Sequence, residues 1–212
     1  MSAWRTDTAT ITVGALLQEV AERFENAALP GWSVLGTPQI VSRGGRSRGL
    51  ALRASRRLES GIVSTIPVAL TPGLRLSVLA SAAFGSPTAA ADRVALALVP
   101  GDVVGSRSAD SRSPVRLVAL EWLGEARRFA YTVESETWTE PAGEWALQAE
   151  HLLSIEIDQS GRAAFYIDNV LRRTSSVRVV GPGQQLLAHI LVSGSGLDPV
   201  PVIAELTATR RR

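Results

Sequence analysis

The stretch that decides the fold is HLLSIEIDQSGRAAFYIDNV, residues 151–170. In its first half, Ile155 and Ile157 alternate with Glu156 and Asp158. Successive side chains of a β-strand point to opposite faces, so this period of two is typical of a strand that buries one face. The pattern predicts a strand whose isoleucines face a core.

The second half of the stretch repeats the pattern after a turn. Residues 159–162, Gln-Ser-Gly-Arg, contain the serine and glycine that turns favour. Beyond them Phe165 and Ile167 share one face, while Tyr166 and Asp168 share the other. We therefore predict an antiparallel hairpin, with a second turn at Asp168 and the asparagine that follows it.

The strand pattern extends through most of the chain. Short segments rich in Val, Ile and Leu are separated by Gly, Pro, Ser and Asp at intervals of roughly 8 to 15 residues, which is typical of a sandwich or barrel. The expected strands lie within residues 32–42, 49–55, 61–70, 74–84, 93–99, 115–124, 128–135, 152–159, 163–173, 176–181, 186–194 and 201–210. About a dozen strands fit two stacked antiparallel sheets better than one open sheet, which would curl or split at that size. The sequence predicts an all-β protein.

Residues 14–26, before the first of these strands, allow two interpretations. Leu16, Leu17, Val20 and Phe24 lie near helical spacing with charged residues between them, which predicts one short helix. A first strand that runs into a turn fits the same residues. The choice between helix and strand stays open.

The domain organisation follows from the length of the chain, since 212 residues are the size of one domain with a short arm. We predict an N-terminal arm or short helix at residues 1–24, a β-sandwich domain at 25–209 and a basic tail at 210–212. No stretch approaches the roughly 18 apolar residues of a membrane helix, so no membrane span is expected. The first residues do not read as a secretory signal. Unless a leader was removed, we expect a cytoplasmic protein or one associated with a virion or another complex.

The charged residues exclude several kinds of chemistry. All 22 basic side chains are arginine, and the chain has no cysteine. Lysine Schiff bases, P-loop lysines, thiol catalysis and thiolate metal sites are therefore impossible. The formal net charge is only +2, so the pI of about 9.9 reflects a lack of groups that titrate between roughly pH 7 and 10. We expect no nucleic-acid partner.

The charges are also unevenly distributed along the chain. Residues 43–57 hold six arginines and no acid, whereas residues 121–158 hold nine acids and two arginines. Two solvated faces would explain this distribution. Opposite patches could equally drive association with another protein or a second copy, and arginine suits such contacts because its planar fork pairs with carboxylates.

Two segments resemble a known family. The order of His151, an alternating strand, a turn and Phe-Tyr-Ile-Asp at residues 165–168 resembles a hairpin of the concanavalin A-like lectin/glucanase jelly roll. Residues 121–124, Glu-Trp-Leu-Gly, are similar to part of a strand in laminarinase and xyloglucan-modifying glycoside hydrolases of that fold. The resemblance covers most of residues 25–209. It implies a two-sheet antiparallel jelly-roll sandwich.

The resemblance fails at the catalytic positions. The hydrolases carry Glu-Ile-Asp-x-Glu, and alignment of the last glutamate with Glu121 puts Leu117 at the nucleophile position and Ala119 at the aspartate. Retaining hydrolysis needs two carboxyl groups about 5 Å apart. Glu125 is the only nearby acid that could substitute, with a different geometry. We predict no catalytic residues, and Glu121 remains a candidate for ligand binding.

Aromatic residues supply the other candidates for ligand binding. Trp138, Trp145 and Tyr131 could stack on sugars, because apolar sugar faces pack on aromatic rings. The two tryptophans lie among glutamates around Pro-Ala-Gly, which predicts a polar surface loop. Trp32 and Trp122 are flanked by apolar strand residues, which favours a place in the core.

The resemblance also implies a calcium site, since jelly rolls of this type often bind calcium with acids near the first and last strands. The matching acids are Glu25, Asp198 and Glu205, and solvated edge charges explain them equally well. No other cofactor is expected. His151 and His189 lack the spacing of zinc ligands, which favours structural roles.

Three functions remain open. The first is a non-catalytic carbohydrate-binding, lectin-like module, whose partners are glycans. The second is a structural or assembly subunit, such as a shell, tail or accessory protein, whose partners are protein neighbours in a homo- or hetero-oligomer. The third is a divergent glycoside hydrolase that acts through Glu121. Fold alone does not choose among them.

Overall fold

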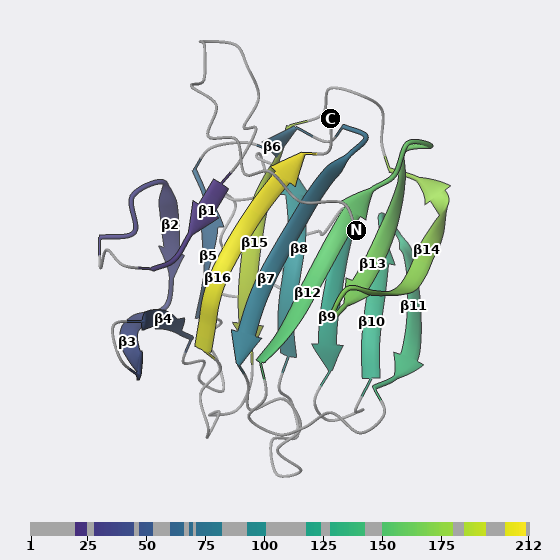
Figure 1. Cartoon of the computed structure of the whole chain (residues 1–212). Helices are drawn as coiled ribbons and strands as arrows, with labels where there is room; N and C mark the ends of the chain where they lie inside the picture. The colour runs from purple at the N-terminus through teal and green to yellow at the C-terminus, as the bar shows by residue number, and fades with distance from the viewer. Residues whose placement is uncertain are drawn as a thin grey trace, which may run out of the picture.

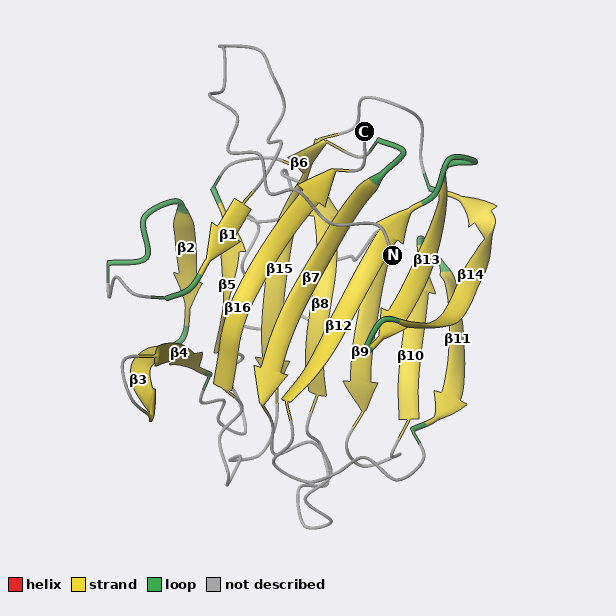
Figure 2. Ribbon diagram, viewed as in Figure 1, coloured by secondary structure: helices red, strands yellow, loops and turns green. Residues whose placement is uncertain are grey.

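The computed structural model is made of strands joined by turns, and none of the residues it describes is helical (Figure 2). It describes residues 20–24, 28–44, 47–52, 60–65, 68–69, 71–81, 93–100, 118–123, 128–142, 150–179, 185–193 and 202–210. All strand pairings among them are antiparallel. The prediction of an all-β chain is confirmed.

The strands form two sheets, which we name the front and back sheets from their places in Figure 1. The front sheet has the order β14 (Val170–Arg178), β13 (Arg162–Ile167), β12 (Glu150–Ile157), β7 (Leu74–Ser81), β16 (Val202–Arg210), β4 (Ser47–Ala51) and β3 (Gln39–Gly44), with β1 (Val20–Glu22) paired to β16. The back sheet has the order β11 (Glu136–Pro141), β10 (Arg128–Val133), β9 (Val118–Leu123), β8 (Arg93–Pro100), β15 (Gln185–Ser193), β5 (Ser60–Ser64) and β2 (Trp32–Leu35), with β6 (Val68–Ala69) paired to β15. This is the predicted two-sheet jelly-roll sandwich.

The predicted hairpin is formed by β12 and β13, and its apolar side chains share the predicted faces. Ile155 lies opposite Phe165, and Leu153 lies opposite Ile167. The predicted turn between β13 and β14 is also present, at Asp168 and the next residue, whose φ angles are +52° and +63°. Two successive left-handed residues form the two-residue turn whose twist matches paired strands. Local sequence therefore determines this part of the fold.

The turn between β12 and β13 is held by Asp158. Its Oδ1 accepts hydrogen bonds from the backbone N–H of Ser160 at 2.7 Å, the Ser160 hydroxyl at 2.6 Å and the backbone N–H of Arg162 at 2.9 Å. Burial raises the pKa of Asp158, but these hydrogen bonds and the Arg162 charge hold it below its ordinary value. The ionised carboxylate thus stabilises the turn.

The core lies between the sheets and is built from alternate residues of each strand. The front sheet contributes Leu74, Leu76, Val78, Leu153, Ile155, Ile157, Phe165, Ile167, Leu206 and Ala208, and the back sheet contributes Ile62, Val94, Leu96, Leu98, Val118, Leu120, Trp122, Phe129, Tyr131 and Val133. Aromatic contacts join its members, with ring centroids 5.2 Å apart for Tyr131 and Phe165 and 5.5 Å apart for Trp122 and Phe129. The predicted burial of Trp122 is confirmed, and Trp32 is partly buried against the same core.

Two segments were not settled by the sequence. Within the segment for which helix and strand were both open, Val20–Glu22 is a strand, and its residues pair with 206–208 of β16. The segment around Trp138 was predicted to be a polar loop, and that prediction is wrong, because Glu136–Pro141 forms the edge strand β11. Edge strands need no buried apolar face, so the alternation that identified other strands is missing here.

Replacement of Phe165 by alanine tests the inter-sheet core. We expect Phe165→Ala to lower the free energy of unfolding by about 3–5 kcal/mol, because it removes a fully buried ring and leaves a cavity beside Tyr131. Leu171→Ala on the next strand is the control, since that leucine is exposed and should cost less than about 1 kcal/mol. Urea unfolding measures both. Equal losses would contradict the assigned faces.

The Asp158 turn makes a prediction about pH. The folded pKa is below the unfolded value of 3.8, so the stabilisation by the carboxylate is present above that value and is lost as the pH falls through the folded pKa. We expect Asp158→Ala to cost about 1 kcal/mol at neutral pH, and the difference from the parent to shrink in acid. Unfolding curves at several pH values measure it. A difference that stays constant with pH would contradict this account.

Candidate functional site

Glu121 lies in the middle of β9 and points away from the inter-sheet core. Its neighbours Leu120 and Trp122 both belong to the core, so alternation along the strand places Glu121 on the outward face of the back sheet. Across the strand pairs it lies opposite Ala95 of β8 and Ala130 of β10. The carboxylate therefore stands between two residues with very small side chains.

The strands beside Glu121 also carry apolar residues on this outward face. A second, smaller apolar cluster lies here, made of Val63, Ala97, Val99 and Ala119. Glu121 is the only acidic residue in β8, β9 and β10, and only 4 % of it is exposed. Ala119 is confirmed on the same face, and Leu117 lies outside the described residues. A carboxylate can accept hydrogen bonds, and the described strands β8, β9 and β10 supply no second acid beside it. Glu125 lies outside the described residues.

Tyr131 and Trp138 are brought together, but not with Glu121. They lie directly opposite each other in β10 and β11. Tyr131 is only 1 % exposed and contacts the core, whereas Trp138 is partly buried against the same core. Both therefore lie on the inner face of the back sheet. The strand period thus places these two stacking candidates on the opposite face of the sheet from Glu121.

The polar end of Tyr131 is satisfied inside the sandwich. Its hydroxyl donates a hydrogen bond to Oε1 of Glu140 on β11. Burial of the phenol raises its pKa far above the ordinary value of 10.0, and the hydrogen bond to Glu140 and the Glu140 charge raise it further, against a smaller lowering by Arg172 and Arg173. Tyr131 thus remains neutral and acts as a structural donor.

Trp138 has a partner in the opposite sheet. The guanidinium carbon of Arg173 on β14 lies 5.1 Å from the centroid of the Trp138 ring, which is a cation–π contact. Nearby, the Ser176 hydroxyl donates to Oε2 of Glu136 at 3.4 Å. These contacts between β11 and β14 were not predicted, since the two strands are far apart in sequence. The run of Leu-Arg-Arg after the Asp-Asn turn was the available signal.

The calcium prediction receives no support from the described residues. Glu25 and Asp198, like the stacking candidate Trp145, lie outside the described residues. Glu205 on β16 lies 3.6 Å from the Nε atom of Arg23, which is an exposed ion pair. Among the described residues no three acidic or histidine side chains gather in a way that could hold a metal ion. No calcium chemistry is therefore assigned.

The two histidines occupy strands of different sheets. Nδ1 of His151 lies 2.8 Å from Oδ2 of Asp168, and Oδ1 of the same aspartate accepts the backbone N–H of Leu152 at 2.9 Å. Asp168 thereby ties the second hairpin turn to the start of β12. His189 lies in β15, opposite Val63 of β5 and Ala97 of β8 in the backbone register. The two backbones are thus in separate sheets.

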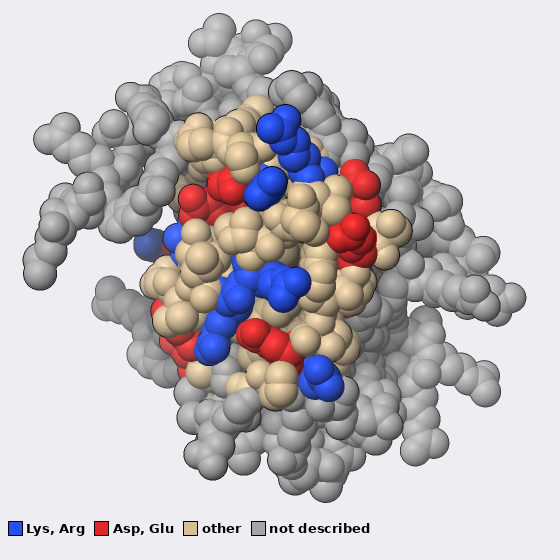
Figure 3. Space-filling model, turned by 90° about the vertical axis from the view of Figure 1, so that its right-hand side faces the viewer, with Lys and Arg blue, Asp and Glu red and all other residues tan. Residues whose placement is uncertain are grey.

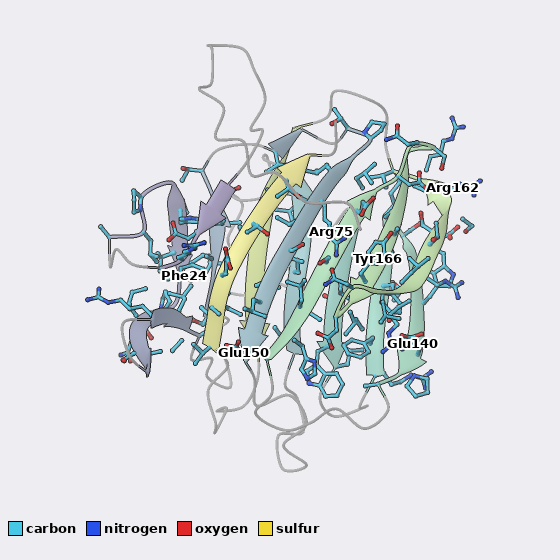
Figure 4. All side chains as sticks on the ribbon, viewed as in Figure 1. Phe24, Arg75, Glu140, Glu150, Arg162 and Tyr166 are labelled. Atoms are coloured by element: carbon cyan, nitrogen blue, oxygen red, sulfur yellow. The ribbon has the colours of Figure 1, made fainter. Side chains whose placement is uncertain are left out.

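A polar network on the outward face of the front sheet was also not predicted. Arg75 is its centre, and it lies beside Tyr166 in Figure 4. The guanidinium carbon is 4.8 Å from the Tyr166 ring centroid, while Nη1 lies 3.7 Å from Oε2 of Glu156 and Nη2 donates to Oδ1 of Asn169 at 2.7 Å. Strand pairing brings these residues together from three strands and a turn. Arg75 is thus engaged by a carboxylate, an amide oxygen and a ring, so the network holds the hairpin together.

Comparison with solved structures places the fold. The carbohydrate recognition domain of Emp47p superposes with a TM-score of 0.62 at 8 % identity, covering 86 % of this chain and 90 % of that one. The exoplasmic/lumenal domain of VIP36 in its Ca2+/Man-bound form gives 0.62 at 14 % identity, covering 92 % and 90 %. A Bacillus licheniformis β-glucanase gives 0.58 at 13 % identity, covering 92 % and 99 %. The chain therefore has the concanavalin A-like lectin and glucanase fold.

Sequence comparison adds no further assignment. No protein-family model and no curated protein sequence matches the chain. Within the described ranges, no helix is long and apolar enough to cross a membrane. The similarity is one of architecture, so the function has to be argued from the residues on this fold.

The state of Tyr131 is testable by titration, because the chain has only two tyrosines. We expect Tyr131→Phe to leave the tyrosinate absorbance of the folded protein unchanged up to about pH 11, since the buried phenol stays protonated. In denaturant the same variant should lose half of the parent amplitude. The parent should also lose stability above about pH 10, where the unfolded phenol ionises and the folded one does not. An altered titration of the folded variant would contradict the buried hydrogen bond.

Proposed function

We propose that this protein is a non-catalytic carbohydrate-binding, lectin-like β-sandwich module. The observation that carries the proposal is the single carboxylate of Glu121 on the outward face of the back sheet, in a fold shared with carbohydrate recognition domains and glycoside hydrolases. Sugar-binding proteins and glycosidases therefore share this scaffold. In this chain, Glu121 alone among the acids of β8, β9 and β10 favours binding over hydrolysis, which needs two carboxyl groups.

The chemistry around Glu121 suits a neutral sugar. A carboxylate accepts hydrogen bonds from sugar hydroxyls, and such charge-assisted bonds are stronger than neutral ones. Ala95, Ala97 and Ala130 lie on the same face with short apolar side chains, but they are buried, so a sugar could pack its C–H faces on them only after they are uncovered. Because Glu121 is largely covered, we expect ligand binding to rearrange the atoms that cover it. Trp145, which lies outside the described residues, remains a predicted stacking residue.

The number of carboxylates argues against a glycosidase. Two acidic groups flank the scissile bond in the common mechanisms, at about 5 Å for retention and roughly 6.5–9.5 Å for inversion. The positions two and four residues before Glu121 are Ala119 and Leu117, neither of which can serve. Glu125 is the only nearby acid that could substitute, and it would need a different geometry, so we expect Glu121 to bind hydroxyls without an acid and nucleophile pair.

A glycan array with neutral mannose- and glucose-containing oligosaccharides tests the proposal. We expect retention of at least one neutral glycan and no release of reducing sugar from it. Glu121→Gln should weaken binding about tenfold, which corresponds to about 1.4 kcal/mol for the loss of a charge-assisted acceptor. Calorimetry on the glycan selected by the array measures the change.

Glu156→Gln is the matched control, because it makes the same substitution on the outward face of the front sheet. It should bind like the parent, and thermal unfolding should show that both variants are folded. Failure of the parent to bind any glycan would overturn the proposal. Hydrolysis that Glu121→Gln abolishes would instead identify a divergent glycosidase.

A further inference from the structure

The two sheets meet at one open side of the sandwich, where β11 ends the back sheet and β14 ends the front sheet. Figure 1 shows the two strands along the same side of the molecule. The contact of Arg173 with the Trp138 ring and the hydrogen bond from Ser176 to Glu136 join them. We name this surface, formed by β11, β14 and the turn before β11, the edge seam.

The edge seam carries a basic stripe beside an acidic stripe. Arg172, Arg173 and Arg178 are exposed on β14, while Glu134 and Glu136 are exposed at the start of the β11 side. Figure 3 shows basic and acidic side chains interspersed on this face. Within the described part of the chain, no ion pair within 4.0 Å joins the two stripes. Within one molecule these exposed arginines and glutamates therefore do not neutralise each other as ion pairs.

The contacts across the seam show which charged residues of β11 and β14 lie at the same position along the two strands, which we call the same level. Arg173 lies beside Trp138, and Ser176 lies beside Glu136, so the residue number rises along β14 as it falls along β11. At one end of the seam Arg178 is therefore level with Glu134 and Glu136. At the other end Arg172 is level with Glu140.

This arrangement is complementary to itself. Two copies can face each other about a two-fold axis that runs parallel to the strands of the seam. The basic stripe of each copy then lies against the acidic stripe of the other. Each residue keeps its position along the strand direction. It places Arg178 of each copy against the acids at the start of the facing β11. The same axis places Arg172 of each copy against the other end of that strand. Every contact then occurs twice with opposite charges facing each other.

We propose that the edge seam is a homodimer interface, occupied by a second copy of this chain. Two of the most exposed large apolar residues in the described ranges, Val170 at 55 % and Leu171 at 53 %, lie at the start of β14 and would be partly covered. The interface would also shield two edge strands, which otherwise offer free backbone groups to any other strand. A polyanionic ligand fits less well, because the acidic stripe would repel it.

The proposed dimer should depend strongly on salt. Exposed ion pairs contribute little individually, and ions screen them over about 10 Å at 0.1 M ionic strength. We expect a weak dimer in about 50 mM NaCl that dissociates at least tenfold more readily in about 500 mM NaCl. Sedimentation equilibrium at several concentrations of the full chain measures this dissociation. A monomer at every concentration in low salt would overturn the proposal.

Charge reversal with mixing tests the two-fold arrangement. Arg178→Glu alone and Glu136→Arg alone should each abolish dimerisation, because each puts like charges together at two symmetric contacts. A one-to-one mixture of the two variants should restore a dimer of parent-like affinity. In that heterodimer each introduced charge faces the opposite introduced charge, and the remaining contact is the native one.

The control is Arg48→Glu on β4, which reverses an exposed arginine in a strand near the other side of the front sheet. It should dimerise like the parent, and glycan binding should be unchanged in all of these variants. Dimerisation that survives both single reversals would overturn the proposal. A mixture that stays monomeric would do the same, and so would an anionic glycan that binds a monomer through Arg178.

Discussion

The constraint on which the rest of this structure depends is the period of two along each strand, applied to two sheets that bury one face against each other. Leu120 and Trp122 must face the core, and Glu121 between them must then face outward. The same rule in the front sheet buries Ile155 and leaves Glu156 beside Arg75. A shift of one residue in any register would exchange these roles, so the core fixes the location of every polar group.

This constraint also explains how much the sequence could predict. The hairpin from β12 to β13 was predictable because its alternation and both of its turns are local, and Asp158 and Asp168 stabilise those turns through bonds to nearby backbone groups. Glu121 obeys the same alternation, because it lies between Leu120 and Trp122, which belong to the core. These features need no knowledge of which strands pair across the molecule.

The remaining features depend on contacts between strands that are distant in sequence. Trp138 has the composition of a polar loop around it, and only its pairing with Tyr131 identifies an edge strand. Tyr131 has an apolar ring and a polar hydroxyl, so its place in the strand pattern fits either the surface or the core. The acceptor that allows its burial, Glu140, lies on the next strand. Arg173 meets Trp138 only because the two sheets end on the same side. Spacing along the chain carries no signal for such a meeting.

The edges and the faces of the sandwich solve different physical problems. An edge strand must avoid pairing with the strands of any other molecule. The charged side chains on β11 and β14 favour a partner surface with charges of the opposite sign at the facing positions. The outward face of a buried strand such as β9 has no free backbone groups, so what it can recognise depends on side chains alone. There Glu121 lies opposite Ala95 and Ala130 and is the only acid of β8, β9 and β10. Lectins and hydrolases share this fold, so the side chains on this face, and not the architecture, determine which chemistry it supports.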